Sequence, residues 1–276
     1  MGETLQVMSF NVRHDTAERT APGDPDHWLD REPLVVELLT RDRPALLGTQ
    51  EPEFHQLPAL RSGLGPSYDV VGFGREGGSA GEYSAILYDT ERLRLEAWDQ
   101  RWLSDTPRLV ASATWGNEIP RILVWARFRD RSTGAVFLHV NSHFDHRCEE
   151  ARERSAVAVR DLIAEAGLPA VVTVDANAPA EDSTPYQILT SAAESGAGGP
   201  DGGLRDAWLV ADDRLTPDVG TFHGYGEPVP EGRRIDWILT TPDIGVESAA
   251  IDAWTKQGRW PSDHVPVRAR LRLPVP

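Results

Sequence analysis

The hydrophobic residues of the chain gather in short runs, and most of these runs end in polar residues. Residues 5–13 are apolar with β-branched members, which predicts a buried strand, and leucine and valine recur at helical spacing within 34–39. A second apolar run, 45–50, follows. The order strand, helix, strand indicates an α/β layer, in which ligands gather beyond the carboxyl ends of strands. Asn11 and Glu51 fall at two such ends.

The middle of the chain shows further strand patterns joined by turn-rich links. Strands are expected at 68–74, 83–88 and 93–98. The segments 122–129 and 135–142 flank a five-residue link that ends in glycine, which predicts a hairpin.

A helix is expected over 149–166, because a glycine and then a proline follow it. The strand predicted at 170–174 leads directly into Asp175. Residues 195–203 are rich in glycine, but no strand precedes them and no Gly-Lys-Ser/Thr follows, so we expect a flexible loop rather than a phosphate cradle. No long linker divides the chain, which favours a single domain over 1–276.

The composition excludes several classes of protein. A hydrophobic content of 40% is enough for a buried core. No apolar run reaches the ~18 residues of a membrane span, so no membrane partner is expected. The first residues lack the basic and apolar blocks of a signal peptide, and the single cysteine, Cys148, excludes an internal disulfide bond. Both features favour a cytoplasmic location.

The chain is strongly acidic, with 43 acidic against 28 basic residues and a net charge of −15. Such a surface repels phosphate backbones at long range, which argues against nonspecific binding of long nucleic acid. A local arginine cluster could still exist within an acidic whole. We therefore expect a small phosphorylated substrate before a nucleic acid.

The segment 261–267, which we expect to be the last strand, carries an imidazole. His264 can act as acid or base at neutral pH, since an unperturbed pKa of about 6.5 suits both roles when a carboxylate fixes the tautomer. Its neighbour Asp263 is a poor partner, because adjacent side chains of an extended segment point to opposite faces. Asp236, in another apolar strand, is the better partner, which leaves Asp263 for a metal ion or its water.

Polar residues end or adjoin most of the predicted strands. Oxygen ligands with amide and imidazole neighbours suit Mg²⁺ or Mn²⁺ rather than structural zinc, which prefers cysteine and histidine. Such an ion would polarise a phosphoryl oxygen and neutralise developing charge. Any one of these residues could be an ordinary strand end, but together they indicate a site. They are Asn11, Glu51, His143, Asp145, Asp175, Asn177, Asp236, Asp263 and His264.

The order of these residues resembles that of the endonuclease/exonuclease/phosphatase family, which has the deoxyribonuclease I-like fold. The resemblance implies an α/β four-layer sandwich of two packed mixed β-sheets flanked by helices. It also implies a divalent-metal-dependent hydrolase that attacks a phosphoester with an activated water. The matching segments span nearly the whole chain and are 9–13, 50–51, 141–145, 175–179, 234–237 and 262–267.

The resemblance further implies a role for each carboxylate in the reaction. Glu51 would hold the metal, with Asn11 and Asp263 nearby. Asp175 would position the attacking water.

The remaining site residues would act on the phosphate, again by resemblance. Asn177 and His143 would contact its oxygens. His264, oriented by Asp236, would stabilise the pentavalent phosphorus or act as a base. At 174–177 the chain has Val-Asp-Ala-Asn where the family usually has Gly-Asp-Phe-Asn, so we expect altered packing around the missing ring.

Arginines near the predicted strand ends are candidate phosphate clamps, because the guanidinium fork matches phosphate geometry. Each could also be a solvated surface residue. The candidate substrate-binding residues are Arg13, Arg75, Arg121, Arg147, Asp145 and His223.

Three other functions compete with a phosphatase or phosphodiesterase acting on a small molecule. A metal-dependent endonuclease or exonuclease of the same fold ranks second. The sequence at 77–81, Gly-Gly-Ser-Ala-Gly, matches the nucleophile elbow of serine esterases, with Ser79 as nucleophile. That elbow must lead from a strand into a helix, whereas a strand is expected at 83–88. The third alternative is a binding module of the same fold without activity. Such a module would be expected to lack the charged residues of the site, and none of them is missing here.

Overall fold

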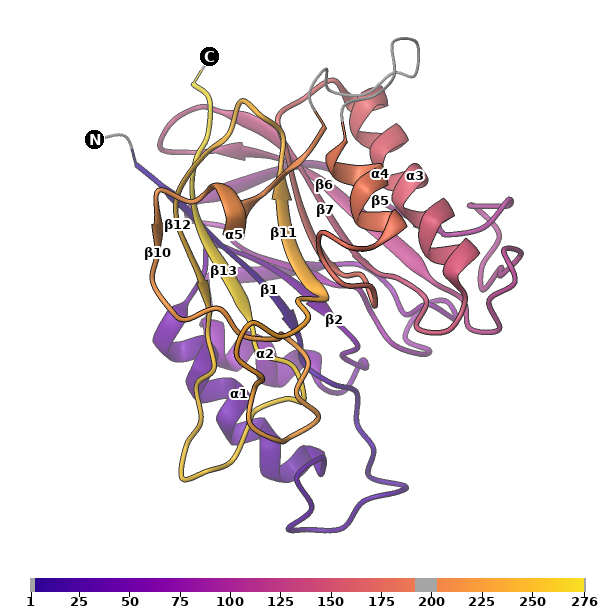
Figure 1. The fold of residues 1–276 in the computed structure, drawn as a ribbon, viewed down its shortest axis with the longest axis vertical. Coiled ribbons are helices and arrows are strands. Elements are labelled where there is room, and N and C mark those ends of the chain that lie inside the picture. The colour runs from indigo at the N-terminus through magenta and orange to yellow at the C-terminus, as the bar shows by residue number, and fades with distance from the viewer. Residues whose placement is uncertain (1–2, 192–202, 276) are drawn as a thin grey trace.

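Two mixed β-sheets lie face to face, and helices cover their outer faces (Figure 1). The computed structural model describes residues 3–191 and 203–275. The arrangement is the four-layer α/β sandwich expected from the sequence. Most of the glycine-rich stretch 195–203 falls outside the described residues.

The first sheet has seven strands, and its two central strands carry site residues. In spatial order the strands are β10 (Asp213–Arg214), β12 (Gly245–Ile251), β13 (Val267–Arg272), β1 (Leu5–Asn11), β2 (Leu46–Gln50), β4 (Ile86–Asp89) and β3 (Tyr68–Val71). β1 runs parallel to β2, and their register pairs Asn11 with Gln50. The carboxyl ends of these strands therefore meet at one edge of the sheet, where Glu51 follows.

The second sheet has six strands: β5 (Leu93–Trp102), β6 (Ile122–Asp130), β7 (Val136–His143), β8 (Ala170–Asp175), β11 (Asp236–Thr240) and β9 (Arg205–Asp206). β6 and β7 are antiparallel neighbours, which confirms the predicted hairpin. Asp175, the last residue of β8, pairs with His143 on one side and with Asp236 on the other. Three predicted site residues thus lie on neighbouring strands.

Helices pack on the outer face of each sheet (Figure 1). α1 (Trp28–Asp42) and α2 (Leu57–Leu64) cover the first sheet, where Leu38 and Leu39 share a core with Phe10 of β1. α3 (Glu149–Ala166) and α4 (Thr184–Thr190) cover the second sheet, and α5 (Ala207–Val210) lies beside β11 and β12. None of the described helices combines the length and apolar character needed to cross a membrane.

The predicted helix at 149–166 has these bounds in the structure. It ends at Gly167, whose φ of 59° is the left-handed conformation in which glycine ends helices without strain. The strand expected at 261–267 is wrong for most of its length, because β13 begins only at Val267. The residues before it form a loop, which makes an isolated β-bridge between Phe222 and His264 and a hydrogen bond from Ser262 Oγ to the carbonyl oxygen of Asn11.

A buried polar cluster joins the two sheets beneath the strand ends. The Oδ1 atom of Asn141 accepts hydrogen bonds from Gln50 Nε2 at 2.8 Å and from Thr173 Oγ1 at 2.9 Å. Its Nδ2 donates to the carbonyl oxygens of Thr49 and Ala85, both at 2.9 Å. All the residues that share these hydrogen bonds are fully buried. A shift of one sheet against the other would therefore leave buried polar groups without hydrogen-bond partners.

The sheets approach so closely at this cluster that only glycine fits at position 48 of β2. A Cβ atom added to Gly48 would overlap Thr173 Oγ1 and lie 2.7 Å from Asn141 Oδ1. The absence of a side chain there is what lets the cluster form.

We expect Gly48→Ala to lower the free energy of unfolding by about 3 kcal/mol or more, because overpacking would also break the hydrogen bonds of Asn141. Gly134→Ala is the control: its φ is 79°, but nothing lies within 4 Å of an added Cβ. That variant measures backbone strain alone, about 1 kcal/mol. Chemical denaturation measures the free energy of unfolding of both variants. If Gly48→Ala lowered it no more than Gly134→Ala, the close contact between the sheets would be contradicted.

His139 extends the same cluster and should make stability depend on pH. Its Nε2 donates to Thr173 Oγ1 at 2.9 Å, and burial lowers the pKa of His139 to about 3. The unfolded chain binds a proton at this residue below about pH 6.5, but the folded protein does not until about pH 3. The folded state is therefore destabilised progressively as the pH falls between these values.

We expect His139→Gln to remove this contribution, so that the Tm falls less from neutral pH to about pH 5 than in the wild type. Calorimetry at both pH values measures the change. A variant whose Tm falls as steeply as that of the wild type would show that His139 is not held neutral by burial.

Candidate active site

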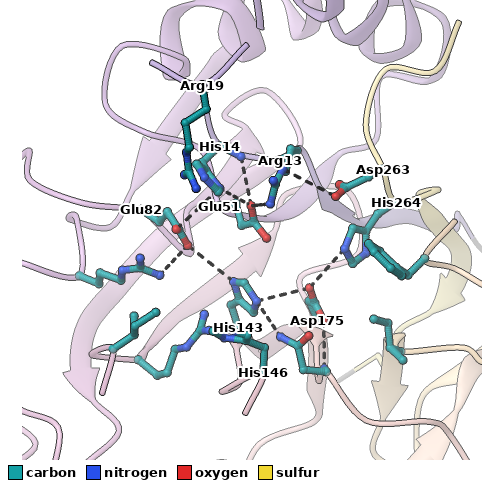
Figure 2. Close-up of a pocket in the computed structure, with 16 residues that line it drawn as sticks. Arg13, His14, Arg19, Glu51, Glu82, His143, His146, Asp175, Asp263 and His264 are labelled. Atoms are coloured by element: carbon teal, nitrogen blue, oxygen red, sulfur yellow. Dashed lines mark hydrogen bonds and ion pairs between the residues drawn. The ribbon is translucent and has the colours of Figure 1, made fainter. Parts of the chain in front are cut away.

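A cavity of about 550 Å³ opens at the ends of the central strands of both sheets (Figure 2). Its walls combine carboxylates, imidazoles and guanidinium groups, with a few apolar side chains at its edge. The predicted site residues that line it are Arg13, Glu51, Arg75, Arg121, His143, Asp175, Asn177, Asp263 and His264.

Asn11 joins two carboxylates from different sheets. Its Nδ2 donates to Glu51 Oε1 at 2.9 Å and to Asp175 Oδ2 at 2.8 Å. Its Oδ1 accepts the backbone N–H of Arg13 at 2.9 Å, and this fixes the orientation of the amide because a backbone N–H can only donate. The carboxamide oxygen is thus turned away from the carboxylates, and the amide nitrogen links them; the role of Asn11 at a metal ion stays a prediction.

Three residues that lie one or two positions after the end of a strand have a left-handed backbone. The φ values are 60° at Arg13, 70° at Glu51 and 50° at Asn177. Non-glycine residues adopt this conformation at an energetic cost, and such residues concentrate at functional sites. Here the left-handed turns accompany the change of direction at which each side chain enters the cavity.

Glu51 is held as an anion. Burial opposes its charge, but the hydrogen bonds from the His14 ring and the Asn11 amide bring the pKa of Glu51 well below its usual value. The His14 Nδ1 lies 2.8 Å from Glu51 Oε2, and the His14 backbone N–H donates to the same oxygen at 3.1 Å. A cation is the natural counterpart of a buried carboxylate kept ionised in this way.

Asp175 is almost completely buried, and its surroundings raise its pKa, whereas those of Glu51 lower the pKa of that carboxylate. Burial, followed by the charge of Asp236, raises the pKa of Asp175 to about 7. The backbone N–H of Asn177 donates to its Oδ1 at 3.0 Å. A carboxylate that titrates near neutrality can exchange a proton with a reacting group.

His264 bonds the partner expected from the sequence. Its Nδ1 lies 2.9 Å from Asp236 Oδ2, and its Nε2 lies 3.8 Å from Asp175 Oδ2. Burial opposes protonation, but the charges of Asp236 and Asp175 raise the pKa of His264 well above its usual value. The ring therefore carries a proton on Nε2, on the side of the cavity. Phe222 packs against it with ring centroids 5.0 Å apart.

His143 is neutral, in contrast to His264. Burial, together with the positive charge of Arg121, lowers the pKa of His143 well below its usual value. Its Nε2 lies 2.9 Å from the Asn177 amide nitrogen, which also donates to the carbonyl oxygen of Phe144 at 3.0 Å. Because the amide nitrogen can only donate, His143 Nε2 is an acceptor and its proton lies on Nδ1.

The donor set fits a divalent cation. One ligand atom each from Glu51, His143 and Asp175 lie within 4.8 Å of one another. Asp175, Asp236 and His264 meet the same condition, but the imidazole and Asp236 already bond each other. The carboxylate oxygens of Glu51 and Asp175, with no cysteine, are ligands of the kind found in magnesium and manganese sites rather than structural zinc sites. The lone pair of His143 Nε2 already accepts the hydrogen bond from Asn177.

Arg13 lies between two carboxylates of the cavity. Its guanidinium nitrogens lie 3.7 Å from Glu51 Oε2 and 3.7 Å from Asp263 Oδ2, and it donates to Asp26 at 3.1 Å. Burial raises the pKa of Asp263 above its usual value. The side chains of Asp263 and Glu51 line the same cavity, and each has the Arg13 guanidinium as a neighbour.

Three predicted substrate-binding residues do not line the cavity. Asp145 is buried, and its Oδ1 accepts the backbone N–H groups of Arg147 and Cys148 in the turn before α3. The Arg147 side chain is 74% exposed and lies 3.6 Å from Glu118. His223 packs on Trp260, with ring centroids 4.4 Å apart. These three side chains are therefore not among the residues that line the cavity, and their contact with a substrate stays a prediction.

Other lining residues were not identified from the sequence. His14 and Glu82 were missed although they directly follow segments that were singled out, because loops have no periodicity to show where a side chain points. The complete set missed is His14, Arg19, Glu82, Ile119, His146, Phe222 and Ile235.

The esterase alternative fails on geometry. Ser79 is exposed in the loop between β3 and β4, and it does not line the cavity. The next element is strand β4 rather than a helix, so the 77–81 segment is not a nucleophile elbow.

The model of the Endonuclease/Exonuclease/phosphatase family matches residues 8–264. The chain belongs to this family. Its members are phosphoester hydrolases, and the chain is therefore a hydrolase of this kind. No curated protein matches its sequence.

Solved structures of this family share both the fold and part of the sequence. An endonuclease/exonuclease/phosphatase from Bacteroides vulgatus is 32% identical, with a TM-score of 0.87, and the match covers 99% of this chain and 100% of that one. A mannosyl-6-phosphatase from Bacteroides thetaiotaomicron is 33% identical, with a TM-score of 0.85 and coverage of 98% and 100%. The human Nocturnin catalytic domain, at 19% identity and a TM-score of 0.71 over 99% and 94%, shares the fold.

Proposed function

We propose that this family member is a divalent-metal-dependent phosphomonoesterase that acts on a small phosphorylated substrate. The observation that carries the proposal is the position of Asp175. Its carboxylate meets Asn11 at 2.8 Å, His143 at 3.4 Å and His264 at 3.8 Å, at the junction of the two sheets. Asp175 thus belongs to the set of carboxylates that could hold a cation and also lies beside a protonated imidazole.

Glu51 and Asp175 are the residues that would hold Mg²⁺ or Mn²⁺, with Asp263 at the far side of Arg13. When bound, the cation would polarise a phosphoryl oxygen and offset the negative charge of the transition state. Asn11 would keep the two carboxylates together against their mutual repulsion.

Asp175 and the side chains around it would perform the other parts of the hydrolysis. Asp175 would orient the attacking water and accept its proton. The His264 Nε2–H would donate to a phosphoryl oxygen, and the imidazolium charge would stabilise the transition state. The Asn177 amide already donates to His143 and to the Phe144 carbonyl oxygen, so it would keep the His143 ring in place. Asp236 keeps that imidazole oriented and protonated.

A small substrate is supported by the size of the cavity and by the charge of the chain. About 550 Å³ lies within the range of small-molecule sites, which is roughly 300–1,000 Å³. A net charge of −15 opposes the approach of a long polyanion. The family member named as a mannosyl-6-phosphatase supports a phosphorylated sugar. A nuclease ranks second, and a cytoplasmic location, favoured by the single cysteine, stays a prediction.

A substrate panel tests the proposal. With Mg²⁺ or Mn²⁺ we expect phosphate release from sugar monophosphates to be faster than cleavage of oligonucleotides at low salt. We also expect EDTA to abolish the activity and added metal to restore it. Faster cleavage of oligonucleotides would reverse the ranking, and activity that persists in EDTA would contradict the metal-dependent reaction.

Asp175→Asn and His264→Gln should each reduce kcat by at least ~100-fold while the Tm changes little, because both groups act on the transition state. Asp161→Asn, an exposed change on α3, is the matched control and should leave kcat unaltered. Steady-state kinetics and thermal unfolding measure the effects. A folded Asp175→Asn variant with a kcat near that of the wild type would remove the role given to this carboxylate.

A further inference from the structure

A guanidinium–carboxylate pair lines the cavity on the side away from His264. Arg75 Nη1 donates to Glu82 Oε2 at 2.6 Å, and each of the two side chains is 14% exposed. Figure 2 shows Glu82 on the other side of His143 from His264. The hydrolytic steps assigned above use neither member of the pair.

The loop that carries the pair is braced by its own backbone. The Arg75 N–H donates to the carbonyl oxygen of Glu82 at 2.9 Å, and the Trp102 ring N–H donates to the carbonyl oxygen of Arg75 at 2.6 Å. A Cβ atom added to Gly74 would overlap the carbonyl oxygen of Ala80, so the two arms of the loop are in contact. The pair is therefore held in place before a ligand arrives, which lowers the entropic cost of binding.

Arg121 and His146 extend this wall of the cavity. Arg121 is only 4% exposed, and its Nη2 donates to His146 Nδ1 at 2.9 Å, which leaves the His146 proton on Nε2. Glu82 and Asp145 offset the charges of the two arginines, with Asp145 lying 3.4 Å from Arg121. The wall thus presents both donors and an acceptor with balanced charge, which suits a neutral polar group better than a second phosphate.

We propose that this wall, with the Arg75–Glu82 pair at its centre, binds the hydroxyl groups of the leaving group. The substrate is then the phosphomonoester of a polyhydroxylated compound such as a sugar. The inference rests on the proposed function and adds the class of leaving group. A hydroxyl both donates and accepts, so neighbouring hydroxyls match a guanidinium and a carboxylate held side by side.

The apolar part of the lining agrees with such a ligand. Phe222 is 53% exposed and lies against His264, and Ile119 and Ile235 also line the cavity. A sugar ring has hydrocarbon faces that these side chains can cover while its hydroxyls meet the charged pair. An alkyl leaving group would desolvate the pair without replacing its hydrogen bonds, and a site of this kind discriminates against such a group.

The test compares two substrates, a hexose 6-phosphate and propyl phosphate, in variants of the pair. In Glu82→Gln and Arg75→Met we expect kcat/KM for the hexose phosphate to fall by at least ~10-fold, mainly through KM. For propyl phosphate we expect a change below about 3-fold, because that leaving group has no hydroxyl to lose. Glu76→Gln, an exposed change in the same loop, is the control and should alter neither substrate.

Each other outcome overturns the inference in a recognisable way. Equal losses for both substrates would show that the pair acts on the hydrolytic residues instead. Unchanged kinetics in a folded Glu82→Gln variant, or a wild-type preference for propyl phosphate, would exclude hydroxyl recognition while phosphomonoesterase activity remains. If the wild type hydrolyses no phosphomonoester with added metal, the proposed function itself fails. Glu82→Gln preserves side-chain shape and carries the test if Arg75→Met does not fold.

Discussion

The hydrogen bonds of one buried amide, that of Asn141, determine how the two sheets meet. Gln50, which bonds this amide, directly precedes Glu51 in the chain, and Thr173, which also bonds it, lies two residues before Asp175. Asn141 itself lies two residues before His143. A buried polar cluster tolerates little displacement, because each lost bond leaves a desolvated group unpaired. The same contacts that align the sheets therefore set the spacing of the site residues above them.

The site is a set of charges that depend on one another. Asn11 holds Glu51 and Asp175 together, and Asp236 and Asp175 keep His264 protonated. Like charges would separate without such links, and each pKa would return toward its usual value. Two histidines a few ångströms from the same carboxylate consequently have opposite protonation states. His143 is neutral and accepts the Asn177 amide N–H, whereas His264 is cationic and presents a donor to the cavity.

The sequence predicted the parts of this arrangement that leave a periodic or positional signal. The bounds of α3, the hairpin of β6 and β7, and the pairing of Asp236 with His264 follow from apolar spacing, a helix-ending glycine and the alternation of side chains. Loops leave no such signal. Asp145 has the appearance of a site residue in the sequence, yet its carboxylate caps the turn before α3, whereas Glu82 lies at the cavity only because its loop folds back on itself.

The account depends most on the claim that carboxylates from the two sheets converge to hold one divalent cation. A crystal structure of the protein with Mn²⁺, with anomalous scattering used to locate the ion, tests this claim directly. The account predicts an anomalous peak between the carboxylates of Glu51 and Asp175, on the cavity side of Asn11. A peak only elsewhere on the protein, or none at saturating Mn²⁺, would contradict it.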